Sequence, residues 1–296
     1  MKSTILVLLL ASIVGVHASS RSQSATPISL KHGISKVFNK RYDTAKSLAA
    51  LEQEVEDYNA QWIASSKDAA QAASRRRLIC MPLDERLFDP PMGAFSHGHV
   101  QTGDKMSIPA VLMKGVNLNK AEVPWLWSVS RVEGVTQERV DVPDSLAKEH
   151  LHEVVGSVLD YRAPPNYIFL PWWMMRALGV QPRDIVDVKL TTTTPPGSLA
   201  KLRPHSSSFS NDIANPQAVL ETELRHYSCL TKGSTIAFDY NGKRYWFDVE
   251  ELRSAPRGEK QPIVKVMDCD LATDFLPAKD SIKKRKKRPQ NDDEDE

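Results

Sequence analysis

Two pairs of histidines, each two residues apart, come closest to a metal-binding spacing in this sequence. His97 and His99 lie in a Ser-His-Gly-His stretch, and His150 and His152 lie in a His-Leu-His stretch. Alternate residues of a strand point to the same side, so each pair can share one metal ion. No third ligand lies near either pair in the sequence. We therefore predict surface or loop histidines and no metal site.

The three cysteines, Cys80, Cys229 and Cys269, are far apart and odd in number. Their spacing forms neither a zinc ligand set nor a disulfide framework. A secreted protein of this size commonly uses disulfides. We therefore expect reducing surroundings rather than the extracellular space.

Motifs of catalysis and cofactor binding are mostly missing from the sequence. It has no dinucleotide-binding Gly-x-Gly-x-x-Gly, no phosphate-binding P-loop, no Gly-x-Ser-x-Gly nucleophile turn and no His-Glu-x-x-His zinc helix. The Asp-Thr/Ser-Gly loop of aspartic proteases is absent as well. We predict no catalytic, cofactor-binding or metal-binding residues and a non-enzymatic protein. A barrel enzyme of unrecognised chemistry is the alternative.

The composition allows one two-lobed domain with flanking segments, since the chain has 296 residues, 41% of them hydrophobic, and a net charge of +2. No stripe of alternating aromatic and basic residues indicates nucleic-acid binding, so we predict no nucleic-acid partner. Five tryptophans lie in apolar strings and are interpreted as core residues: Trp125, Trp127, Trp172, Trp173 and Trp246.

The N-terminus predicts a secretory signal peptide over residues 1–18. Met1-Lys2 is followed by an apolar run from Ile5 to Val16 and by a small-residue site, with cleavage expected between Ala18 and Ser19. A membrane anchor is the alternative, although the run is shorter than the roughly 20 residues that span a bilayer.

Residues 19–42 resemble an organelle transit peptide. They contain no Asp or Glu, many Ser and Thr residues, and five cations: Arg21, Lys31, Lys36, Lys40 and Arg41. A disordered linker is the alternative. A signal peptide followed by a transit-like segment is the two-part address of plastids of secondary origin, such as the apicoplast.

Residues 43–77 predict a helix rich in Ala, Glu, Lys and Gln, which ends at the cations Arg75–Arg77. Apolar residues follow a heptad-like seam with alternating spacings of three and four: Leu48, Leu51, Val55, Tyr58 and Trp62. Two heptads are marginal alone, so we expect the seam to dock on the domain or on a partner.

A weak internal repeat suggests a pseudo-symmetric barrel over residues 78–194. Residues 107–116 and 169–180 each read as an apolar strand, a proline at a helix N1 position, and helical turns that end at a glycine. A further apolar strand follows each copy, over residues 125–129 and 185–190. We expect each helix to close one opening of the barrel. Coincidence between short apolar strings is the alternative.

Residues 195–279 predict a compact α+β lobe, separated from the first by the turn-rich segment Thr191–Gly197. A helix is predicted from the N-cap Asn215, with Gly233 at its end. Asn241-Gly242 between two alternating strands predicts a hairpin, because both turn residues need a positive φ. A last strand is predicted over residues 262–267.

Residues 280–296 predict a disordered charged tail. Six consecutive cations at 283–288 precede five consecutive acids at 292–296, and blocks of like charge repel and remain solvated. Nucleic acid, an acidic protein surface and a nuclear import receptor are conceivable partners of the cations, and a tail with no dedicated partner is the alternative.

Four strings of this sequence closely resemble the ubiquitin fusion degradation protein 1 family. They are Gly103–Pro109 (GDKMSIP), Leu170–Met175 (LPWWMM), Asp212–Glu221 (DIANPQAVLE) and Asp268-Cys269-Asp270. The resemblance runs in continuous order from about residue 78 to residue 279. It implies a β-rich α+β fold in which a double-psi β-barrel lobe precedes a smaller mixed α/β lobe.

The resemblance also implies a non-enzymatic, ubiquitin-dependent adaptor of the AAA unfoldase valosin-containing protein. The implied partners are the unfoldase hexamer, ubiquitin or ubiquitin-like chains, and a partner similar to nuclear protein localisation protein 4. It does not identify the residues that contact ubiquitin or the unfoldase. The sequence lacks the Phe-x-Gly-x-Gly type docking motif of many members, which puts docking by that route in doubt.

The N-terminal address adds a location to this expected function. An adaptor that enters the secretory route resembles the retooled degradation machinery of complex plastids, which moves proteins across a surrounding membrane. We therefore expect work in the periplastid compartment. A conventional adaptor of endoplasmic-reticulum-associated degradation, in the cytosol at the endoplasmic reticulum, is the alternative.

Overall fold

The computed structural model describes residues 30–83, 102–132 and 150–281, and only the backbone of residues 30–46. The predicted signal peptide with its Ala18/Ser19 cleavage site, the pair His97 and His99, and the charged run after Ser281 lie outside the described residues. The chain divides between Lys46 and Ser47 into two units, which are described separately. None of the helices in the described ranges combines the length and apolar character needed to cross a bilayer.

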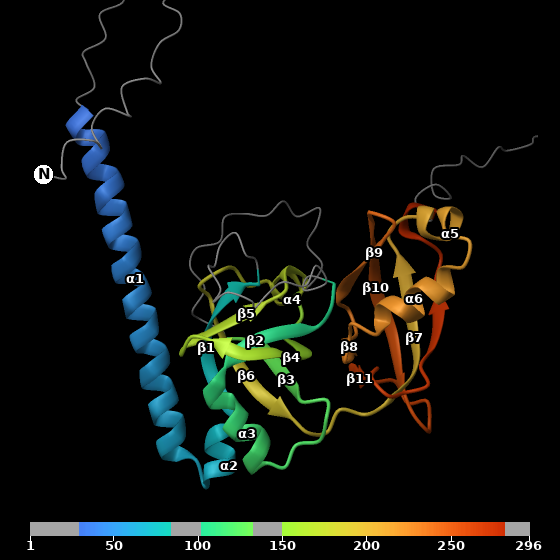
Figure 1. The fold of residues 1–296 in the computed structure, drawn as a ribbon, viewed down its shortest axis with the longest axis horizontal. Coiled ribbons are helices and arrows are strands. Elements are labelled where there is room, and N and C mark those ends of the chain that lie inside the picture. The colour runs from blue at the N-terminus through green and yellow to red at the C-terminus, as the bar shows by residue number, and fades with distance from the viewer. Residues whose placement is uncertain (1–29, 84–101, 133–149, 282–296) are drawn as a thin grey trace, which may run out of the picture. The chain divides into compact units, whose positions relative to one another are not determined.

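Six strands form a closed β-barrel (Figure 1), in the order β1-β5-β2-β4-β3-β6. The strands are β1 (Arg75–Pro82), β2 (Lys105–Pro109), β3 (Leu126–Arg131), β4 (Glu153–Ala163), β5 (Tyr167–Leu170) and β6 (Ile185–Thr191).

The barrel has a twofold pseudo-symmetry that follows from its strand order. Exchanging β1 with β4, β2 with β5 and β3 with β6 leaves every neighbour relation unchanged. Strand directions follow the same exchange, since β1–β5 and β4–β2 are both parallel, while β1–β6 and β4–β3 are both antiparallel. The predicted pseudo-symmetric barrel is thereby confirmed, and the fold class is that of a double-psi barrel.

The two repeated units carry their helices as predicted, but each proline lies one residue earlier than expected. Pro109 and Pro171 occupy the N-cap positions of η1 (Ala110–Leu112) and α4 (Trp172–Leu178), with extended ψ values of 146° and 145°. The proline ring fixes φ near −65°, and this value suits an N-cap as well as N1. The sequence pattern therefore could not separate the two positions.

The two glycines of the repeat have different roles. Gly179 caps α4 with a left-handed φ of 65°, as predicted. Gly115 does not end a helix, because it is buried inside α3 (Met113–Leu118). A Cβ atom there would lie 2.4 Å from the carbonyl oxygen of Ala73, at the end of α2 (Ala69–Ala73). Close approach of two helices, and not capping, requires glycine at this position.

The predicted N-terminal helix is confirmed, but both of its predicted ends are wrong. Helix α1 (Leu30–Ser65) begins inside the segment predicted as transit-like and ends before Arg75–Arg77. Those arginines start β1 and pair with residues 187–189 of β6, so the barrel begins at Arg75 rather than at residue 78. Pairing in the barrel overrides the local helix propensity of the Ala-rich sequence before it.

The apolar seam of α1 docks on the outside of the barrel. Val55 is fully buried against Ile79 of β1 and Ile185 of β6. Asn59 adds two hydrogen bonds to β1: its side chain accepts from the Arg77 N–H at 2.8 Å and donates to the Arg77 carbonyl at 2.9 Å. The prediction that the seam docks on the domain, rather than on a partner, is confirmed.

Replacing Val55 with alanine is expected to lower the free energy of unfolding by about 2 kcal/mol, because two buried methyl groups are lost and a cavity is left. Urea denaturation of the full chain measures this change. Glu54→Ala, at an exposed position of the same helix turn, is the control and is expected to change it by less than about 0.5 kcal/mol. Equal effects of the two substitutions would contradict docking of α1 on the barrel.

The second lobe contains a four-stranded sheet in the order β12-β7-β10-β9 and a two-stranded sheet of β11 and β8. Its elements are β7 (Gly197–Pro204), α5 (Ser208–Asp212), α6 (Pro216–Leu224), β8 (Cys229–Thr231), β9 (Thr235–Tyr240), β10 (Lys243–Ser254), β11 (Ile263–Lys265) and β12 (Ala272–Phe275). The predicted smaller mixed lobe is confirmed.

The predicted helix cap and hairpin turn of this lobe are confirmed, but the predicted helix end at Gly233 is wrong. The Asn215 side chain caps α6 by accepting from the Ala218 N–H at 3.1 Å, and Asn241-Gly242 forms the predicted turn with φ values of 49° and 73°. Gly233 does not end the helix, because α6 stops at Leu224 and β8 lies between them. Gly233 instead has a φ of 83° in the turn before β9.

The tryptophans are only partly core residues. Trp127 and Trp173 are buried, at 0% and 4% exposure. Trp125 and Trp246 are half-buried, and Trp172 is 37% exposed, so its prediction as a core residue is wrong. Neighbouring residues of a short helix face different ways, and one of the Trp172-Trp173 pair must point outward.

Candidate functional site

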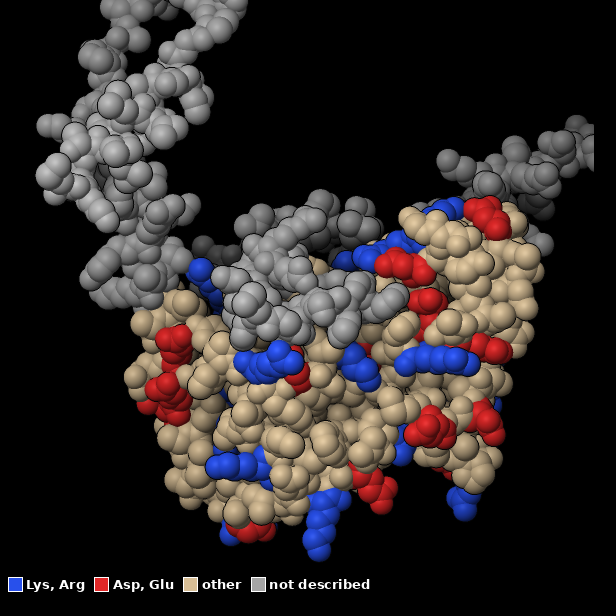
Figure 2. All heavy atoms as spheres, in the orientation of Figure 1, with Lys and Arg blue, Asp and Glu red and all other residues tan. Residues whose placement is uncertain are grey.

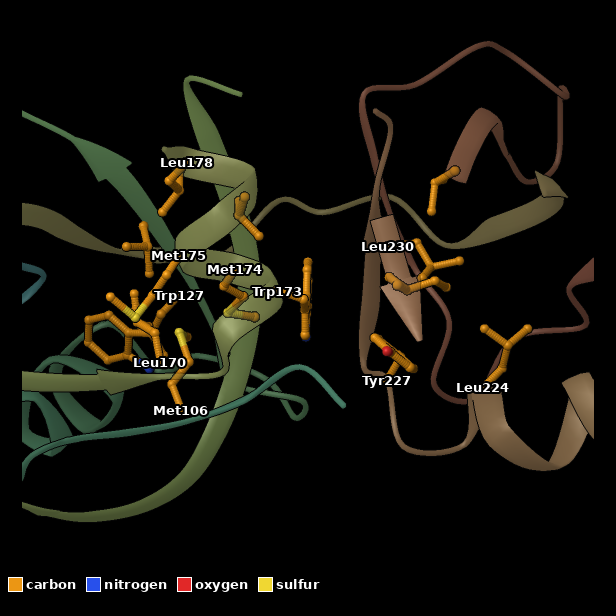
Figure 3. Packing of buried hydrophobic residues seen from close by; sticks show 14 of the residues in the cluster. Met106, Trp127, Leu170, Trp173, Met174, Met175, Leu178, Leu224, Tyr227 and Leu230 are labelled. Carbon is orange, nitrogen blue, oxygen red and sulfur yellow. The ribbon is translucent and has the colours of Figure 1, made fainter. Parts of the chain in front are cut away.

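The hydrophobic core continues from the barrel into the second lobe. One cluster of buried residues contains Met174 of α4 together with Leu224 and Leu230 of the second lobe. Trp173 projects from α4 toward Tyr227 (Figure 3), and their ring centroids are 6.1 Å apart. The lobes are therefore packed on each other, and we call this contact region the lobe junction.

A buried carboxylate lies at the lobe junction. Asp104, just before β2, has no solvent exposure and accepts hydrogen bonds from the Ser228 and Cys229 N–H groups at 2.8 and 3.1 Å. The Lys105 ammonium donates to the hydroxyl groups of Ser157 and Ser228, at 2.6 Å each. These contacts join the barrel to the strand β8 of the second lobe.

The electrostatics of the lobe junction favour protonated groups. Burial raises the pKa of Asp104, and this effect outweighs the opposing effects of Lys105 and the two N–H donors. Burial and the neighbouring Asp104 raise the pKa of the Cys229 thiol, and burial raises that of the Tyr227 hydroxyl. These perturbed groups are buried at the lobe junction, where their contacts join the two lobes.

A pocket opens on the second lobe, and we call it the α6 pocket. Its volume is about 500 Å³, and it lies between the C-terminal part of α6 and the connection from β11 to β12. Apolar residues contribute to its walls: Leu224, Tyr227, Val266 and Leu271. Of these, Leu224 and Tyr227 also belong to the buried cluster that Figure 3 shows, so the pocket wall continues into the shared core.

Among the described residues, the metal and disulfide candidates form neither a metal site nor a disulfide. His150 and His152 are both exposed, and all three cysteines are free. Within the described ranges, no group of three or more His, Cys, Asp or Glu side chains is placed to hold a metal ion.

Two strings that carried the family resemblance supply the two features of this region. Gly103–Pro109 provides Asp104 and Lys105 of the lobe junction, and Asp268-Cys269-Asp270 lines the α6 pocket. Reasoning from residue types missed both features. Asp104 meets its partners more than 120 residues later in the chain, so no local spacing could reveal the contact.

Charges of both signs are interspersed over the face of the molecule that Figure 2 shows. Among the described residues of that face, neither sign forms a continuous patch. A nucleic-acid backbone is bound by a basic patch or stripe, and the described residues in view form none.

These features define a two-lobed protein: a double-psi barrel joined through a common core to an α/β lobe that carries an open pocket. The family model "Ubiquitin fusion degradation protein UFD1, N-terminal subdomain 1" matches residues 87–194, and the model for N-terminal subdomain 2 of the same protein matches residues 196–278. Together they span almost two thirds of the chain. The chain belongs to the ubiquitin fusion degradation protein UFD1 family.

Curated relatives match the same region. The ubiquitin fusion degradation protein 1 homolog of Dictyostelium discoideum is 30% identical over 182 residues, which are 62% of this chain and 48% of the relative. Ubiquitin fusion degradation protein 1 of Saccharomyces cerevisiae is 39% identical over 122 residues, 41% of this chain and 32% of the relative. The human "Ubiquitin recognition factor in ER-associated degradation protein 1" is 36% identical over 118 residues, 40% of this chain and 36% of the relative. The matches thus span a third to a half of each relative's length.

Proposed function

We propose that this chain is a non-enzymatic adaptor that binds ubiquitin or ubiquitin-like chains and presents modified proteins to an AAA unfoldase hexamer. The observation that carries this proposal is the presence of both N-terminal subdomains of the UFD1 family in one packed unit. The name of the human relative describes ubiquitin recognition in ER-associated degradation, which supports the same role.

The lobe junction suits an adaptor, which binds other proteins and catalyses no reaction. Burial raises the pKa values of Asp104, Cys229 and Tyr227, and all three are buried at the lobe junction. Their contacts fix the barrel against the second lobe, and we propose that each lobe presents one modifier-binding surface. Two linked surfaces bind a chain of repeated modifiers more tightly than either surface alone.

Affinity purification of the full chain from its native cells tests this function. We expect an AAA unfoldase hexamer, ubiquitin-like conjugates and a protein similar to nuclear protein localisation protein 4 to co-purify. Recovery of none of these three in repeated purifications would contradict the proposal.

We further propose that the adaptor works in protein translocation across a membrane of a complex plastid, in the periplastid compartment. The support is the two-part address in residues 1–42. Residues 1–46, fused to a fluorescent protein, are expected to direct it to the rim of the plastid. Uniform cytosolic or nuclear fluorescence would contradict this location.

A conventional adaptor of endoplasmic-reticulum-associated degradation is the second candidate, and the names of the mammalian relatives favour it. The N-terminus of the mature protein separates the two candidates. Mass spectrometry is expected to find it at Ser19 or further along the chain if the secretory route is used. A protein that retains Met1 would favour the conventional adaptor.

A further inference from the structure

The α6 pocket carries net negative charge. Glu221, Asp268 and Asp270 contribute three carboxylates to its lining, and Arg225 contributes one cation. Asp268 and Asp270 are exposed at the pocket, and neither forms a salt bridge within the described part of the chain. A ligand with positive charge is therefore attracted to this pocket.

The pocket does not suit a metal ion. In the residues that the structure describes, no three His, Cys, Asp or Glu side chains converge on a point where a metal could be held. Cys269 lies between the two aspartates, and its thiol donates to the Met267 carbonyl at 3.3 Å. The pocket charge is thus spread around an opening and suits a larger organic cation.

The walls of the pocket suit the stem of a long basic side chain. Val266 and Leu271, which are half-buried, offer apolar surface beside the carboxylates, and the buried Leu224 and Tyr227 belong to the same lining. Lysine and arginine side chains lay their methylene groups on apolar surface while the charged end reaches a polar rim. The volume of about 500 Å³ is in the range of ligand pockets, about 300–1,000 Å³, and leaves room for an apolar neighbour of the basic residue.

We propose that the α6 pocket binds an extended peptide segment of a partner protein through one lysine or arginine side chain, with an adjacent apolar side chain against its walls. The charge complementarity and the apolar walls select this occupant. The site does not depend on the proposed function, because its chemistry involves no modifier and no unfoldase.

Two matched pools of fluorescently labelled nonapeptides test this site on the full chain. One pool has a central arginine next to a leucine, and the other replaces the arginine with citrulline, which has the same shape and no charge. Fluorescence anisotropy is expected to show saturable binding of the arginine pool and binding about fivefold to tenfold weaker of the citrulline pool.

Paired variants assign the binding to the pocket. Asp268→Asn with Asp270→Asn is expected to weaken binding of the arginine pool about fivefold to tenfold. The control is Glu259→Gln with Asp274→Asn, which makes the same change in charge at exposed positions outside the pocket lining and is expected to stay within about twofold. Equal binding of the two pools, or equal effects of the two double variants, would overturn the site.

Ubiquitin-chain binding of the same variants separates this site from the proposed function. We expect Asp268→Asn with Asp270→Asn to weaken peptide binding and to leave ubiquitin-chain binding within about twofold. The peptide site would be overturned if the wild type showed no arginine-dependent peptide binding while the double variant lost ubiquitin-chain binding. That result would leave the adaptor function intact.

Discussion

Replacing Asp104 with alanine is expected to lower the free energy of unfolding by about 3 kcal/mol. The substitution leaves the buried N–H groups of Ser228 and Cys229 without their acceptor, and each unsatisfied buried donor costs about 1–3 kcal/mol. It also removes the carboxyl group that lies 3.6 Å from the Lys105 ammonium at the lobe junction. Urea denaturation of the full chain measures the change.

Asp104→Asn is the matched control, because its side-chain carbonyl can still accept a hydrogen bond and carries no charge. We expect it to cost less than half as much as the alanine variant. An alanine variant as stable as the wild type would show that the carboxylate does not hold the lobes together.

The difference in stability between the wild type and Asp104→Asn should depend on pH, because the pKa of Asp104 is raised. Burial raises the folded-state pKa above the ordinary value of 3.8, so the fold favours the protonated acid. The stability that the protonated Asp104 adds to the fold is complete below the pKa of the unfolded chain. This stability is lost as the pH rises through the higher pKa of the folded state. The wild type should therefore lose stability relative to Asp104→Asn as the pH rises from about 4 toward neutrality. A constant difference over this range would contradict the direction of the shift.

Trp173→Ala is expected to lower the free energy of unfolding by about 3–5 kcal/mol, as for other large buried aromatic residues. The indole ring packs toward Tyr227, and its N–H donates to the Gly103 carbonyl at 2.7 Å. The loss therefore acts on both lobes at once. Thermal and urea denaturation measure it, and chemical shifts of β8 report whether the junction opens.

The adjacent tryptophan provides a sharp control for this experiment. Trp172 is 37% exposed, against 4% for Trp173, so Trp172→Ala is expected to cost less than about 1 kcal/mol. Trp173→Phe keeps much of the packing and removes the hydrogen bond to Gly103, and we expect an intermediate cost. Similar costs for the two alanine variants would contradict the packing of Trp173 at the lobe junction.

Elements defined by neighbouring residues could be predicted from the sequence. The Asn215 cap forms within one turn of its own helix, and the Asn241-Gly242 hairpin needs only the positive φ of its two turn residues. The repeat predicted the barrel symmetry, because each copy contains its own strand, proline and helix. Local chemistry decides these elements.

Features set by distant pairing could not be predicted in this way. Arg75–Arg77 follow an Ala-rich helical sequence, yet they are strand residues because β6 supplies a hydrogen-bonding partner more than 100 residues away. The strands β7 and β12 pair in parallel, and no short turn connects them to signal the contact. The role of Asp104 could not be predicted, because it rests on hydrogen bonds from the N–H groups of Ser228 and Cys229, which lie far along the chain.

Equilibrium binding of ubiquitin chains to the immobilised full chain tests the proposed adaptor function. We expect saturable binding of tetra-ubiquitin, and tighter binding of tetra-ubiquitin than of mono-ubiquitin, because the proposed surfaces on the two lobes can engage successive modifiers of one chain. Absence of saturable binding for both ligands up to about millimolar concentration would contradict the adaptor function.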